Sequence, residues 1–197
     1  FSPPVIELSQ PFGNYVNPPP NYQVGGLGEW LSRGFVAWVK DKHLSEINVS
    51  IFTDAIRAVL GGETRTEWFP KSGLGFFVVA TDGSYEGFDA LKVVGTYGRV
   101  LEMNVGTHGF SEVLNHDFIR LRREDSRLPD ACSTCDISDW CNGGFLPTRY
   151  SKENGFNNPS LYCTDLQMLF RCVATWLLQN KELPGDIRRS ILDRRWL

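Results

Sequence analysis

Four cysteines in the C-terminal half of the chain have the spacing of metal ligands. Cys132, Cys135 and Cys141 stand in the stretch CSTCDISDWC, and Cys163 follows with 21 residues between it and Cys141. Thiolates are soft ligands that suit zinc or the iron of an iron–sulfur cluster. Nearby glycines let the backbone approach such a centre closely. The pattern predicts a four-cysteine metal site and leaves the choice between zinc and iron open.

The fifth cysteine, Cys172, lies beside the apolar face of a predicted helix and is interpreted as a small buried hydrophobe. An odd number of cysteines crowded into residues 132–172 does not resemble a disulfide scaffold, which spreads and pairs its cysteines. A redox disulfide protein is a weaker interpretation than a metal site. The sequence therefore predicts a reducing compartment, the cytoplasm.

The composition is that of a globular protein. The chain has 197 residues, of which 42% are hydrophobic and 13% aromatic, enough to bury a sizeable core. Its formal net charge of −3 argues against a nucleic-acid or anionic-membrane surface. No apolar run approaches the roughly 18 residues of a membrane span. We therefore expect neither nucleic acid nor membrane as a partner.

Helical periodicity marks the first third of the chain after an irregular start. Residues 1–25 hold a short apolar run and then a loop rich in Pro, Gly and Asn. Residues 28–42 follow a helical period. A second helix, around Ile51–Leu60, is predicted to stop at Gly61-Gly62.

The middle of the chain changes to strand character. Residues 74–80, LGFFVVA, predict a strand, residues 81–84 a turn, and Tyr85–Val94 a second extended segment that completes a hairpin. Helix returns over Phe110–Arg123. Residues 132–163, which we call the cysteine segment, are expected to be rich in loops. Residues 164–180 predict a strong helix with one apolar face.

The segment CSTCDISDWCNGGFLPTRYSKENGFNNPSLYCTDL resembles the cysteine-rich C-terminal domain of radical SAM enzymes of the SPASM type. More narrowly, it resembles the branch that modifies ribosomally made peptides, including cyclophane-forming maturases. The resemblance rests on C-x2-C-x5-C, the GG-x-LP-x-RY run and GFNNPSLYC. LGFFVVATDGSYEGFDALK resembles the hairpin that precedes the cysteines, and GEWLSRGFVAWV and IFTDAIRAVLGGETRTE resemble the helices after the catalytic barrel. The likeness extends over about residues 5 to 180.

The resemblance implies an α+β fold in four parts. Residues 1–25 are a barrel-end strand and loop, residues 26–72 a helical linking segment, residues 73–182 the auxiliary-cluster domain, and residues 183–197 a C-terminal tail. Val5–Leu8 resembles the last strand of the catalytic barrel. The chain is therefore expected to be the C-terminal part of a longer protein.

The resemblance also implies the metal group. Cys132, Cys135, Cys141 and Cys163 match the four ligands of one auxiliary [4Fe-4S] cluster. The chain has no C-x3-C-x2-C motif, which holds the cluster that cleaves S-adenosylmethionine. S-adenosylmethionine and a second [4Fe-4S] cluster are accordingly expected in a missing N-terminal barrel, and this chain alone is expected to be inactive.

The family often carries a further auxiliary cluster, and its ligand positions are altered here. They fall at Leu74 or Gly75, at Phe88, and at Phe145. Because several ligands are missing together, we expect a member with one auxiliary cluster, in which apolar side chains fill the other site.

The implied activity is that of an oxidoreductase. The intact protein would abstract a hydrogen from a side chain of a precursor peptide and form a crosslink such as a cyclophane. A reductant such as flavodoxin or ferredoxin would supply electrons. The loop at Asn14, Tyr15 and Pro18–Pro20 is expected near the peptide, because the family has this loop at the mouth of the active site.

Two further residues are candidates for chemistry. Asp54 adjoins Thr53, which aligns with a proposed proton-accepting Asp of sulfatase-maturing relatives; the alternative is that either residue caps its helix. Arg149 follows the cysteines and is expected to hydrogen-bond cluster sulfide or to pack the loop.

A rival class of function stays open. A four-cysteine zinc site can staple a small non-enzymatic module that binds a leader peptide or a protein partner. Metal content distinguishes the two classes, since an iron–sulfur protein is brown and a zinc protein is colourless.

Overall fold

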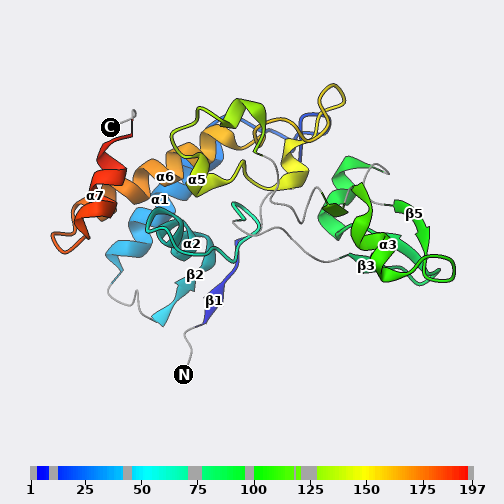
Figure 1. Ribbon diagram of the computed structural model, residues 1–197. Coiled ribbons are helices and arrows are strands. Elements are labelled where there is room, and N and C mark those ends of the chain that lie inside the picture. Colours follow the sequence, from blue (N-terminus) through cyan, green and yellow to red (C-terminus); the bar gives the residue numbers. More distant parts are fainter. Residues whose placement is uncertain are drawn as a thin grey trace.

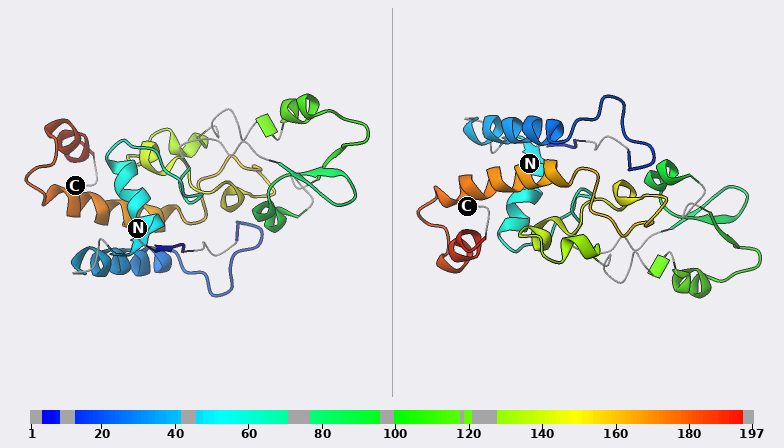
Figure 2. Two further views of the ribbon diagram at one scale, coloured as in Figure 1. Left: turned by 90° about the horizontal axis from the view of Figure 1, so that it is seen from below. Right: turned by 90° about the horizontal axis from the view of Figure 1, so that it is seen from above.

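Two long helices form the centre of the molecule. The computed structural model describes residues 4–8, 13–41, 46–70, 77–95, 100–117, 119–120 and 128–194. Helices α1 (Gly26–Lys40) and α6 (Cys163–Leu178) lie side by side in the three views of Figures 1 and 2. A Cβ atom on Gly28 would lie 2.6 Å from the Cα of Asp165, so only glycine permits this close approach. Both predicted helices are confirmed, within two residues at each end.

The main core lies between these helices and α2 (Ser50–Val59). Leu31 and Phe35 of α1 are fully buried against it, as are Leu166 and Phe170 of α6. Their spacing of four residues places each pair on one helix face. After α2, Gly61 has a φ of 81°, a left-handed conformation that ends the helix where the glycine pair predicted.

The N-terminal run forms a short strand, as expected. Strand β1 (Val5–Ile6) pairs in parallel with β2 (Asn48–Val49), with Val5 opposite Asn48. The fold is α+β, with helices and two small sheets and no closed barrel in the described part of the chain. No helix among the described residues is long and apolar enough to cross a membrane.

A separate lobe carries the second sheet, at the opposite end of the molecule from helix α7 (Gly185–Leu192) (Figures 1 and 2). Strands β3 (Val78–Val79) and β4 (Ser84–Glu86) form the predicted hairpin, and β5 (Val100–Asn104) joins the other side of β4. We call this part the hairpin lobe. The sequence did not predict β5, and the earlier part of the first predicted strand, residues 71–76, lies outside the described residues.

The prediction of a strand through Val94 is wrong. The strand β4 ends at Glu86, and the 3-10 helix η2 (Asp89–Val94) follows. Phe88, Leu91 and Val94 recur every three residues, which is the period of a 3-10 helix, and all three are buried in one small cluster. Burial of this face therefore favours the helix over a continued strand.

Two shorter helices, α3 (Phe110–Asn115) and α7, lie away from the cysteine segment in the sequence. Helix α3 ends earlier than predicted, because His116 is extended, with φ −61° and ψ 133°. The prediction of one continuous helix to Arg123 is therefore wrong at His116, and residues 121–127 lie outside the described residues. Helix α7 (Gly185–Leu192) packs on the main core through the fully buried Ile191.

Candidate metal centre

Three of the four predicted ligands lie at the ends of helices, and Cys135 lies between two of these helices. Cys132 ends the 3-10 helix η3 (Asp130–Cys132), and its carbonyl accepts a hydrogen bond from the Cys135 N–H at 3.1 Å. Cys141 ends the short helix α5 (Ser138–Cys141), and Cys163 begins α6. Each sulfur is therefore placed by the end of a turn or helix.

The structure brings the four thiols to one small cavity. Cys132, Cys135, Cys141 and Cys163 all line it, and none is in a disulfide. The other lining residues are Ile137, Ser138, Gly143, Pro159 and Ser160. Among the described residues, no group of three or more His, Cys, Asp or Glu side chains forms a ready-made site for a metal ion. A metal group here is therefore a proposal, which rests on the convergence of four soft donors.

The thiols influence one another electrostatically. Burial, followed by the neighbouring Cys135 and Cys132, raises the pKa of Cys163 to about 11. Burial raises the pKa of Cys141 further, and Cys163 is the next contributor. The pKa of Cys132 is raised by burial and by Cys135, against a lowering contribution from Arg149. Clustered thiols that resist ionisation bind a cation with release of protons.

A left-handed turn directs the chain after Cys141. Asn142, Gly143 and Gly144 have φ values of 50°, 76° and 75°. A Cβ on Gly144 would lie 2.6 Å from the Cβ of Ser160, so the glycine fits where no other residue does. This contact brings the turn against the segment that leads into Cys163.

Ser160 organises that segment. Its hydroxyl lies 2.7 Å from the Thr148 hydroxyl and accepts a hydrogen bond from the Tyr162 N–H at 3.1 Å. Its carbonyl accepts the N–H of Cys163 at 2.9 Å. Sequence reasoning did not single out Ser160, although its place three residues before Cys163, next to Pro159, is a turn signal.

Arg149 ends the 3-10 helix η4 (Leu146–Arg149) and is 3% exposed. Its Nε donates a hydrogen bond to the carbonyl of Phe156 at 3.1 Å. Burial lowers its pKa, and the nearby Cys132 and Cys141 act in the opposite direction. The side chain therefore lies near the thiols and also packs the loop, which is compatible with both expected roles.

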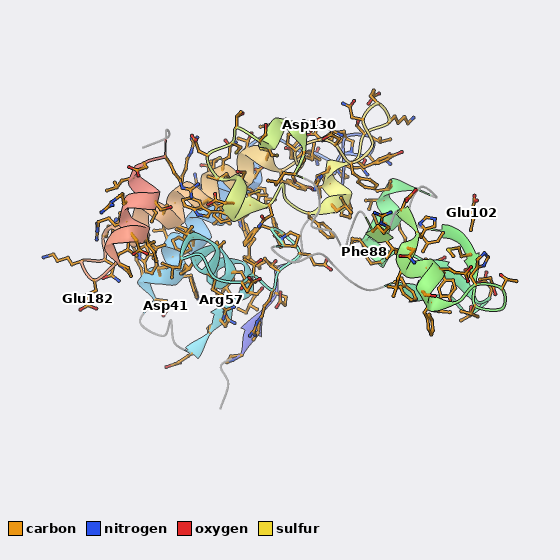
Figure 3. All side chains as sticks on the ribbon, in the orientation of Figure 1. Asp41, Arg57, Phe88, Glu102, Asp130 and Glu182 are labelled. Carbon is orange, nitrogen blue, oxygen red and sulfur yellow. The ribbon has the colours of Figure 1, made fainter. Side chains whose placement is uncertain are left out.

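Asp54 lies in α2 and has only internal contacts among those described. It is 2% exposed, its Oδ2 accepts the backbone N–H groups of Arg65 and Thr66 at 2.7 Å each, and its Oδ1 pairs with Arg57 at 2.8 Å. Figure 3 labels Arg57 beside α2. Helix α2 begins after Val49 without a side-chain cap, so the alternative of a helix cap is wrong for Thr53 and Asp54 alike. The contacts of Asp54 favour a role in holding the following loop.

The N-terminal loop is tied to the cysteine segment. Asn14 is fully buried and donates from Nδ2 to the carbonyl of Val93 in η2 at 3.0 Å. The Tyr15 hydroxyl donates to the carbonyl of Pro159 at 3.1 Å, and the Tyr15 N–H donates to the carbonyl of Tyr150. The loop therefore connects the hairpin lobe with the cysteine segment.

Two phenylalanines meet where the resemblance places the ligands of a further cluster. The rings of Phe88 and Phe145 pack with centroids 5.8 Å apart, and both side chains are almost fully buried. Leu91, Val94 and Phe156 complete this cluster, which we call the apolar joint. Figure 3 shows Phe88 on the side of the hairpin lobe that faces the cysteine segment. The remaining expected positions, Leu74 and Gly75, lie outside the described residues.

Asp165 is a structural residue that sequence reasoning missed. Its carboxylate is fully buried, and its Oδ1 accepts the Gly28 N–H at 2.7 Å, in the first turn of α1. A carboxylate at a helix N-terminus is favoured by the helix dipole. The acidic residue two positions after Cys163 was a visible signal, but its partner is 137 residues away.

Solved structures of the protein anSMEcpe share the α+β fold of this chain. The native form of anSMEcpe with bound AdoMet aligns with a TM-score of 0.64 and 20% identity, over 81% of this chain and 44% of that chain. The same protein with AdoMet and the Kp18Cys peptide gives 0.62 and 19%, over 82% and 47%. The chain spans less than half the length of these proteins, and at this identity the likeness shows the fold. No family model matches the sequence, and no curated protein matches it.

Proposed function

We propose that this chain is the auxiliary-cluster part of a radical SAM enzyme of the SPASM type that modifies a ribosomally made precursor peptide. One observation carries the proposal: four cysteines, none of them in a disulfide, line one small cavity. They all lie between positions 132 and 163 of the chain. The resemblance of the cysteine segment supports it. The fold likeness to structures crystallised with AdoMet and with peptides supports it independently.

Cys132, Cys135, Cys141 and Cys163 would hold one [4Fe-4S] cluster, with Arg149 beside it. Such a group, when bound, accepts and passes on single electrons. Residues that line the cavity would enclose this group: Gly143 allows close approach of the backbone, and Ile137 and Pro159 contribute apolar surface. A buried, partly apolar shell limits water and thereby tunes a cluster's reduction potential.

The rest of the activity belongs to the intact protein. S-adenosylmethionine and a second [4Fe-4S] cluster would lie in an N-terminal barrel, and flavodoxin or ferredoxin in the cytoplasm would supply the electron. The product would be a side-chain crosslink of the cyclophane type. Asp54 stays the candidate proton acceptor of this reaction and is a position to test. Its described contacts favour a structural role instead.

The apolar joint supports a single auxiliary cluster in this chain. By the family resemblance, Phe88 and Phe145 stand at two ligand positions of the further cluster. Their rings pack against each other and fill the space between these positions. Apolar side chains offer no ligand to iron. We therefore expect about four irons per chain rather than about eight.

Metal analysis of anaerobically purified chain tests the proposal. A brown protein with about four irons per chain, reduced to near zero in Cys163→Ala, is the expected result. Cys172→Ala is the matched control and should keep its iron, because Cys172 does not line the cavity. A colourless chain with one zinc would instead favour the binding module. A chain that takes up neither metal after reconstitution would refute a metal centre.

A further inference from the structure

One arginine near the C-terminus reaches into the cysteine segment. Arg194 follows α7, and its guanidinium carbon lies 3.6 Å from the centre of the Trp140 ring. Its Nη1 and Nη2 bind the two carboxylate oxygens of Asp139 at 2.9 Å each. Nη1 also donates to the carbonyl oxygen of Asp136. The Arg194 side chain is only 12% exposed, whereas its partner Asp139 is 63% exposed, so the guanidinium is held against the protein while the ion pair itself faces water.

The contacts fall on one short stretch, the arm between Cys135 and Cys141. Asp136 directly follows the first of these cysteines, and Trp140 directly precedes the second. One side chain thus contacts the arm at both ends, from an element more than 50 residues further along the chain. A contact at both ends fixes the length and direction of the arm, and with them the separation of the two sulfurs.

We propose that Arg194 is a positioning residue that holds Cys135 and Cys141 at the spacing required for the metal group. The inference rests on the proposed function for the identity of that group, and on the geometry alone for the position of the thiols. Only arginine provides a planar fork that binds a carboxylate with two hydrogen bonds while stacking on an aromatic ring. Lysine keeps the charge and loses both features.

The test measures thiol reactivity in the reduced, metal-free chain. Iodoacetamide labelling over time, followed by peptide mass spectrometry, gives a rate for each cysteine. Arg194→Ala should raise the rates at Cys135 and Cys141 by about tenfold, because the arm loses the two-pronged bond to Asp139, the bond to the Asp136 carbonyl and the stacking on Trp140 together. Arg194→Lys should behave like the alanine variant rather than like the parent.

A second arginine provides the matched control. Arg188 lies in α7 and binds the carbonyls of Leu178 and Asn180 at the end of α6, away from the cysteine arm. Arg188→Ala should leave the rates at Cys135 and Cys141 within about twofold of the parent.

Two results would overturn the inference. One is an unchanged rate at Cys135 and Cys141 in Arg194→Ala. The other is an equal rise at all five cysteines with loss of the helical circular dichroism, which is general unfolding. The labelling result is independent of metal, so a parent chain that binds no iron refutes the proposed function and leaves this test intact. If the parent does bind iron, a chelator should remove it about tenfold faster from Arg194→Ala.

Discussion

Replacing Gly144 by alanine should disturb the proposed metal centre without changing any of its four cysteines. The new Cβ would lie 2.6 Å from the Cβ of Ser160, a distance that real side chains do not adopt. Ser160 must then move, and the carbonyl of Ser160 holds the N–H of Cys163 at 2.9 Å. The substitution should therefore displace the first turn of α6 and the sulfur that it carries.

The size of the effect follows from a comparison with Gly155→Ala. Both glycines are left-handed, with φ of 75° and 58°, but a Cβ on Gly155 would meet nothing within 4 Å. Left-handed backbone costs alanine about 1–2 kcal/mol, which should be the whole effect at Gly155. Overpacking adds about 1–3 kcal/mol at Gly144, so its free energy of unfolding should fall by about 2–5 kcal/mol. Urea unfolding of the metal-free chain, followed by circular dichroism, measures both.

A double substitution separates the clash from other causes. Ser160→Gly removes the Cβ that Gly144→Ala would strike, so the double variant should lose about 1–3 kcal/mol less than the sum of the single variants. The reasoning is refuted if Gly144→Ala and Gly155→Ala destabilise equally, or if the two changes at 144 and 160 are additive. Iron loading should fall in Gly144→Ala and stay near the parent's level in Gly155→Ala.

Three further predictions concern other parts of the molecule. Phe88→Ala and Phe145→Ala should each lower the free energy of unfolding by about 3–5 kcal/mol in urea titrations, and the double variant by less than the sum; strict additivity would mean that the rings do not support each other. Asp54→Asn should lower the free energy of unfolding by about 1–3 kcal/mol in the same assay, because it replaces a buried carboxylate that accepts two backbone N–H groups. An unchanged unfolding midpoint would contradict the structural role of Asp54. The metal-free chain should lose stability as the pH rises from the ordinary thiol pKa of 9.0 towards about 11. In this range the unfolded chain releases thiol protons that Cys141 and Cys163 retain in the folded chain, so unfolding becomes more favourable. Equal urea midpoints at about pH 8 and about pH 10 would contradict this.

The sequence predicted those features that depend on local pattern. The helical period and the glycine pair after Leu60 placed α2, and the apolar face of residues 164–180 placed α6. The four cysteines that line one cavity were singled out because soft donors at short spacing have few other uses, and their role as metal ligands stays a prediction. These signals lie within one element or one turn, so neighbours in the sequence are enough to reveal them.

The sequence did not predict the features that depend on distant partners. The 3-10 helix η2 forms because Phe88, Leu91 and Val94 are buried together, and their partner Phe145 is more than 50 residues away. Local β propensity is overridden in such a case. Arg194 likewise contacts residues more than 50 positions before it, in the arm between Cys135 and Cys141. Its local sequence does not indicate which distant residues it binds.

The apolar joint also bears on the order in which the protein is assembled. Phe88 and Phe145 attach the hairpin lobe to the cysteine segment through packed rings, and Asn14 adds a hydrogen bond from the N-terminal loop. Attachment by hydrophobic contacts is available as soon as the chain leaves the ribosome, whereas attachment through a metal cluster waits for iron delivery. We therefore expect docking of the hairpin lobe on the cysteine segment to need no metal, so that a chain without iron keeps this contact.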